Sequence, residues 1–164
     1  MALAAGTSGP VIGFLNGSGD FTVKEGITGA WTGEATGASQ IALTTGRSGP
    51  VIGFLDQSGN FFVKEGIGGA WTEEATGAAK IALAPGSAGP VIGFLDQSGN
   101  FAVKEGVGGS WTAEATGASQ IALTTGRSGP VIAFLNSSGD FDVKEGIGGA
   151  WTTETSSASM IALA

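Results

Sequence analysis

Cysteine, histidine and tyrosine are all missing from this chain, and charged side chains are few. Without cysteine there is no disulfide framework and no thiolate chemistry. Without histidine the chain lacks the most common general base and metal ligand. Acidic residues outnumber basic ones by 14 to 7, and the net charge of −7 argues against nucleic acid or an anionic membrane as a partner. We therefore predict no metal site and no cofactor.

Long apolar stretches are missing as well. No run approaches the roughly 18 residues that a membrane-spanning helix needs, so we expect no membrane insertion. The first residues, MALAAG, have neither a basic segment nor a long apolar core, and this predicts no secretion signal. The cellular location is left open by these observations.

Glycine, in contrast, is abundant, with 31 residues among 164. The glycines recur at fixed places because one unit is repeated four times with a 40-residue period, marked by Pro10, Pro50, Pro90 and Pro130. Together with a hydrophobic content of 41%, periodic glycines indicate many tight turns between short strands.

Each copy contains four strand candidates. In the first copy they are Val11–Leu15, Phe21–Glu25, Trp31–Thr36 and Ser39–Thr44. The segment Asn16–Asp20 is rich in turn formers and predicts a hairpin, with Gly19 at positive φ. Short strands at this spacing, without helical periodicity, predict an all-β fold.

Four strands in every 40 residues are typical of a β-propeller blade. A blade buries its two faces only against neighbours, which explains why apolar residues occur at both strand parities. We predict one domain over residues 1–164 that forms a four-bladed β-propeller. The alternative is an eight-bladed ring made of two chains, because similar short strands stand at both ends, in Met1–Ala4 and Ile161–Ala164.

Two short motifs carry a resemblance to known proteins. VKEG at Val23–Gly26 and the G-x-W-T-x-E run at Gly29–Glu34 recur in every copy. With them, the repeat resembles the blades of bacterial and fungal propeller lectins, including tachylectin-like repeats and the VKEG repeats of actinobacterial propeller proteins. The resemblance covers the whole chain. It implies that the IAL strand, Ile41–Leu43, is the inner strand of its blade. The implied blades are about 1–40, 41–80, 81–120 and 121–160, with 161–164 as a closing strand.

Four side chains per repeat are candidates for a sugar site. An indole can stack on a sugar ring, and a Lys-Glu pair kept in all copies can bind hydroxyls, whereas position 22 varies between copies. The candidate ligand-binding residues are Trp31, Trp71, Trp111, Trp151, Lys24, Lys64, Lys104, Lys144, Glu25, Glu65, Glu105, Glu145, Glu34, Glu74, Glu114 and Glu154.

Structural roles compete with these assignments. The tryptophans are also suited to packing between blades, and the lysines to an ion pair with Glu34 and its equivalents; we favour both interpretations. Arg47 and Arg127 occupy a loop position that holds Thr7 or Ser87 in the other copies, and we interpret them as solvated charges.

Repetition favours binding over catalysis. Nearly identical blades provide nearly identical environments, whereas catalysis needs groups whose pKa values are driven apart, so we predict that the chain is not an enzyme. Several weak sites on one body raise avidity. We therefore predict a multivalent carbohydrate-binding protein with glycans as partners and one weak site per blade or inter-blade groove. The alternatives are a symmetric structural or engineered scaffold and a protein-interaction platform, and a homo-oligomer remains open.

Overall fold

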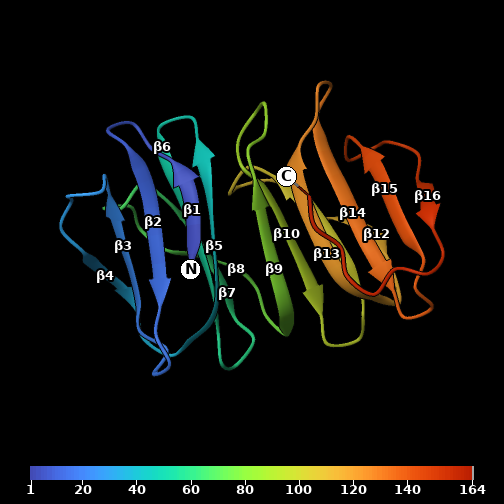
Figure 1. The fold of residues 1–164 in the computed structure, drawn as a ribbon, viewed down its shortest axis with the longest axis horizontal. Coiled ribbons are helices and arrows are strands. Elements are labelled where there is room, and N and C mark those ends of the chain that lie inside the picture. The colour runs from blue at the N-terminus through green and yellow to red at the C-terminus, as the bar shows by residue number, and fades with distance from the viewer. Residues whose placement is uncertain (164) are drawn as a thin grey trace. The chain divides into compact units, whose positions relative to one another are not determined.

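The computed structural model describes residues 1–163. Within this range the regular secondary structure consists of β-strands alone (Figure 1). Sheet A consists of β1 (Ala2–Ala5), β2 (Pro10–Leu15), β3 (Phe21–Glu25) and β4 (Thr32–Ala35). Sheet B consists of β5 (Ala38–Gly46), β6 (Gly49–Asp56), β7 (Phe61–Glu65) and β8 (Thr72–Ala75). Sheet C consists of β9 (Ala78–Ala84), β10 (Val91–Asp96), β11 (Phe101–Glu105) and β12 (Thr112–Ala115). Sheet D consists of β13 (Ala118–Thr125), β14 (Pro130–Asn136), β15 (Phe141–Glu145) and β16 (Thr152–Thr155).

Each sheet is a four-stranded antiparallel meander in which consecutive strands pair. This confirms the predicted all-β class and the four-stranded blade. In the described range there is no helix long and apolar enough to cross a membrane. The IAL strand opens each sheet: in β5, Leu43 lies opposite Ile52 of β6. Counting from Pro10 places this strand last in its copy, whereas the resemblance to propeller lectins places it at the inner end of its blade.

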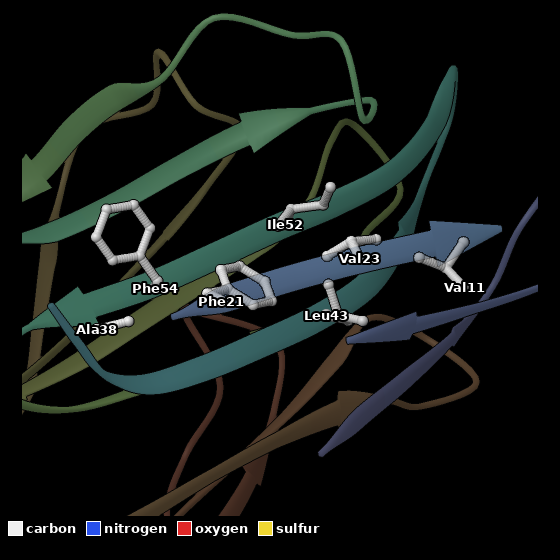
Figure 2. Packing of buried hydrophobic residues seen from close by; sticks show 7 residues of the cluster. All are labelled: Val11, Phe21, Val23, Ala38, Leu43, Ile52 and Phe54. Carbon is white, nitrogen blue, oxygen red and sulfur yellow. The ribbon is translucent and has the colours of Figure 1, made fainter. Parts of the chain in front are cut away.

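The chain divides into two compact units, Met1–Ile81 and a second unit from Ala82 onward. In each unit the core lies between two sheets. Figure 2 shows this for the first unit, where Phe21 and Val23 of sheet A pack with Ile52 and Phe54 of sheet B. The second unit repeats the arrangement with sheets C and D. Strand alternation puts β-branched and aromatic side chains on both faces, so a sheet can contact a neighbour on either side.

The hairpin after each Phe-Leu pair has the predicted turn, with Gly19 at a φ of 85°. Its first side chain caps the turn: Asp56 Oδ1 accepts hydrogen bonds from the backbone N–H groups of Ser58 and Asn60, each at 2.8 Å. In two repeats the acid and amide are exchanged, and there Asn16 Nδ2 donates to Asp20. The exchange preserves the hydrogen bond between the two side chains, so the turn needs one acid and one amide in either order.

The edges of three predicted strands differ from the structure, and the first of them starts at Pro10, not at Val11. The third strand starts at Thr32, not at Trp31, because pairing with β3 begins where Thr32 faces Val23. The fourth is longer than predicted and runs from Ala38 to Gly46. Of the predicted closing strand 161–164, residues 161–163 lie outside the strands, and Ala164 lies outside the described residues.

The loop after each VKEG motif depends on a glycine that admits no side chain. A Cβ at Gly69 would lie 2.1 Å from the backbone oxygen of Glu65, whereas a Cβ at Gly68 would meet no atom within 4 Å. We expect Gly69→Ala to lower the free energy of unfolding by about 1–3 kcal/mol, because backbone must move. Gly68→Ala is the matched control and is expected to be close to neutral. Urea denaturation of both variants tests this, and equal losses would contradict it.

Candidate functional site

The lysine that recurs in every repeat, Lys64 in sheet B, reaches the second recurring glutamate of the preceding sheet, Glu34. Lys64 Nζ of β7 lies 2.5 Å from Glu34 Oε2 of β4, and the two side chains are only 4% and 2% exposed. In the second unit, Lys144 forms the same ion pair with Glu114. The favoured interpretation of an ion pair is therefore confirmed for these two pairs. The sequence did not show that the partner comes from the neighbouring repeat.

The same ammonium group is held by two further contacts within its own repeat. Lys64 Nζ donates a hydrogen bond to the Ile67 backbone oxygen at 2.6 Å and lies 4.8 Å from the centre of the Trp71 ring. All four lysines make both contacts. A buried cation over an aromatic face is stabilised by the ring quadrupole. Lysine, carbonyl and indole thus form one cluster in every repeat.

The tryptophan also meets a phenylalanine of its own sheet. Trp71 lies edge-on to Phe54 with ring centres 4.8 Å apart, and Phe94–Trp111 and Phe134–Trp151 repeat this geometry. Trp71 also packs against the core of the first unit. Trp31 is different, since half of its surface is exposed. Three of the four candidate indoles are therefore engaged in packing, and Trp31 presents the most open face.

The first conserved glutamate braces a loop. Glu25 Oε1 accepts hydrogen bonds from the backbone N–H of Ser8 at 2.7 Å and from the Thr7 hydroxyl at 3.1 Å. These two bonds, chiefly that from Ser8, lower the pKa of Glu25. Glu105 and Glu145 accept the equivalent backbone bonds. This carboxylate therefore fixes the loop between the first two strands of its sheet.

Burial has the opposite effect at the second glutamate. The pKa of Glu114 is raised by desolvation, against the lowering influence of Lys144. In Glu34 and Glu114, Oε1 is buried without a hydrogen-bond partner in the described residues. In these buried carboxylates, the ion pair with the lysine is therefore the interaction that offsets the loss of hydration.

The structure therefore brings three of the four predicted side chains together, but from two neighbouring repeats and not from one. Each cluster joins Lys and Trp of one repeat with Glu of the repeat before it, as in Lys64, Trp71 and Glu34. The first glutamate, such as Glu25, lies apart and holds its loop. A sugar at these residues would have access to the indole face and not to the buried charges.

A cavity of about 370 Å³ lies elsewhere, between two neighbouring loops of the second unit. The loop between β9 and β10 contributes Pro85 and Ser87, and the loop between β13 and β14 contributes Arg127, Ser128 and Pro130. Glu105 and Glu145, the loop-bracing acids, hold Ser87 and Ser128 in place. The two sides of the cavity are joined by the Thr125 hydroxyl, which donates to the Pro85 backbone oxygen at 3.1 Å.

Arg127 gives this cavity its only charge. Its side chain is exposed and forms no hydrogen bond or ion pair within residues 1–163. The sequence predicts a solvated loop charge for Arg127 and gives no indication of the cavity. The available signal was its occurrence in every second repeat, which is compatible with a site shared by two neighbouring blades. A larger hollow of about 590 Å³ at the opposite end of sheet D, beside Ser156–Ser159, is lined by no charged side chain.

Comparison with known proteins supports the fold and leaves the family open. No protein-family model matches the chain, and no curated protein sequence does. Among solved structures, the SapL1 lectin in complex with α-methyl fucoside is 13% identical over 92% of this chain, with a TM-score of 0.56. The six-bladed β-propeller lectin of Aleuria aurantia is 18% identical over 97%, with a TM-score of 0.53. A mutant of that lectin in complex with α-methyl-L-fucoside is 18% identical over 96% of this chain, with a TM-score of 0.55.

These likenesses show a β-propeller fold, with sheets that serve as blades. The resemblance to propeller lectins is thus supported at the level of fold, whereas the tachylectin-like and VKEG-type assignment stays a prediction. This chain spans 60–64% of the length of the lectin chains that it matches.

Proposed function

We propose that the protein binds carbohydrate without catalysing a reaction, and that its sites lie in the grooves between neighbouring blades. The observation that carries the proposal is the Arg127 cavity. Its volume of about 370 Å³ lies within the range of roughly 300–1,000 Å³ that is common for small-molecule sites. The structural neighbours named above are lectins that recognise fucose or are in complex with a fucoside, and this supports a sugar as the ligand.

The groups around the cavity suit a neutral sugar. The planar guanidinium of Arg127 offers several N–H donors in a fixed arrangement to sugar hydroxyl and ring oxygens. Ser128 adds a hydroxyl, while Pro85 and Pro130 provide apolar surface for the C–H face of the ring. Because Glu105 and Glu145 already hold the two loops, binding requires little ordering of the backbone.

A second location for the sugar is the exposed part of the tryptophans, as the sequence suggested. Trp31 is half exposed, and its indole can stack on a sugar ring. A tryptophan recurs at this position in every repeat, but the other three indoles pack against phenylalanines, so the open indole face is that of Trp31. The buried Lys and Glu side chains would then orient the indole and have no contact with the sugar.

The Arg127 cavity is tested by titration calorimetry with α-methyl-L-fucoside and a small panel of other methyl glycosides. We expect Arg127→Ala to weaken binding of the preferred sugar by about 10- to 100-fold, because hydrogen bonds from a charged donor are lost. Lys80→Ala is the matched control: it removes one exposed cation outside the cavity and is expected to leave binding unchanged. Equal binding by wild type and Arg127→Ala would exclude this cavity, and a loss in Trp31→Ala alone would favour the indole.

A further inference from the structure

The contact between sheets A and B defines how one repeat docks on the next. The face of sheet B that carries Ile52, Phe54 and Lys64 packs on sheet A, where Val11 and Phe21 line the opposing face. Sheets C and D repeat the contact with equivalent residues. Each repeat therefore has a lysine face, which receives the preceding repeat, and a glutamate face, which receives the following one.

The lysine face of sheet A is open. Phe14 is 48% exposed, whereas its equivalent Phe54 is 8% exposed in the first unit's core. Ile27 and Trp31 are likewise exposed, at 76% and 50%. Lys24 has the carbonyl and indole contacts of its equivalents, but no carboxylate within Met1–Ile81 pairs with it. This face thus has every element of a repeat contact except the repeat that covers it.

The glutamate face of sheet D is uncovered as well, and it carries the groups that would pair with the lysine face of sheet A. Glu154 is exposed, whereas the equivalent Glu34 and Glu114 side chains are both 2% exposed beside a lysine. Phe141 and Val143 are only partly buried, although their equivalents in the other three sheets are at most 1% exposed. The acid that Lys24 lacks is present here, next to an apolar surface that fits the one around Phe14.

The end of the described chain marks where a following sheet would start. Gln40 Nε2 donates to the Ile81 backbone oxygen, and the Ile81 N–H donates back to Gln40. Gln120 accepts a hydrogen bond from the equivalent N–H, that of Ile161, but donates to the Ser159 backbone oxygen. Residues 161–163 nevertheless belong to no sheet. Met1 is the equivalent of Ile161, so β1 of a following sheet A would take this place by displacing residues 161–163 from Gln120.

We propose that the lysine face of sheet A binds the glutamate face of sheet D of a second copy of this chain. Lys24 of one copy then pairs with Glu154 of the other, while Phe14, Ile27 and Trp31 become covered as Phe54, Ile67 and Trp71 are. The contact is head-to-tail, because two different surfaces meet.

The test is the mass of the protein in solution, measured by light scattering across a wide range of concentrations. Wild type is expected to exceed the monomer mass of 16.0 kDa. Glu154→Lys, at an exposed position, and Lys24→Glu are each expected to weaken self-association by at least about tenfold, because like charges then face each other. Glu73→Lys is the control: Glu73 is equally exposed, lies away from both faces, and its reversal is expected to preserve the mass.

Mixing the two reversal variants makes the test specific for a second copy. In an equimolar mixture of Lys24→Glu and Glu154→Lys, every contact between unlike chains again pairs opposite charges. The mixture is therefore expected to regain the wild-type mass at concentrations where each variant alone stays close to the monomer mass of 16.0 kDa. A monomeric wild type at all concentrations would overturn the proposal and indicate that the chain's own repeats cover these faces. An unchanged mass in Glu154→Lys would overturn it as well.

Discussion

Replacing Lys64 with alanine is expected to lower the free energy of unfolding by about 3–5 kcal/mol, since one partner of a buried ion pair is removed. The Glu34 carboxyl group would be left in a site that is 2% exposed without its cation partner. The Ile67 backbone oxygen and the Trp71 face would lose their contacts with the ammonium group too. Chemical denaturation followed by intrinsic fluorescence measures the loss.

Lys24→Ala provides the matched control for Lys64→Ala. Lys24 makes the same carbonyl and indole contacts but no ion pair within its unit, so we expect a loss of only about 1 kcal/mol. Both variants are compared at concentrations where the protein is monomeric, so that association does not contribute. The double variant Lys64→Met/Glu34→Leu is expected to recover most of the stability, because an apolar pair replaces the charges. Similar losses for Lys64→Ala and Lys24→Ala would refute a dominant role for the ion pair.

Replacing Trp71 with alanine is the second change with a large expected effect. The ring packs edge-on against Phe54 and under the Lys64 ammonium group, and it borders the core of the first unit. We expect a loss of about 3–5 kcal/mol in the free energy of unfolding, which is usual when a packed aromatic side chain is truncated.

Trp31→Ala separates packing from sugar binding. Because half of the Trp31 surface is exposed, we expect it to cost roughly half as much stability as Trp71→Ala. Stability and glycan binding are measured on the same samples. If Trp71→Ala leaves stability intact and abolishes binding, the indole is a sugar platform and its assignment to packing is wrong.

Much of the fold could be predicted because the repeats act as an internal comparison. Turn residues located the hairpins, and Gly19 was correctly predicted to have positive φ. The invariance of Lys64 beside variable neighbours correctly indicated an ion pair with a glutamate equivalent to Glu34, but not which repeat supplies it. Strand ends were predicted less accurately, because they depend on the pairing between strands. Thr32 pairs with β3 and begins β4, whereas Trp31 lies just outside the strand.

The arrangement between repeats was beyond the sequence. Apolar residues at both parities show that both faces of a sheet are buried, but not which face meets which neighbour. For this reason the cluster of Lys64 with the preceding repeat's Glu34 was not distinguished from one within a single repeat. The Arg127 cavity was missed because its walls are mostly small loop residues, whose role becomes visible only when two loops lie side by side.

The two proposals are independent in their tests and complementary in their consequence. A glycan site between blades gives weak binding, and head-to-tail association through Lys24 and Glu154 would multiply the number of sites on one particle. Avidity rises strongly when sites are held on one body. A variant such as Glu154→Lys would then lose avidity on a glycan surface while each cavity keeps its affinity for free sugar.

The most direct measurement of the central claim is binding of the wild-type protein to a panel of immobilised glycans that includes fucosides, with free sugar as competitor. The account predicts saturable binding to a defined subset of glycans, competition by the matching methyl glycoside, and loss of the signal in Arg127→Ala. No binding to any glycan, at protein concentrations that would detect millimolar sites, would contradict the account and leave a structural or protein-binding role.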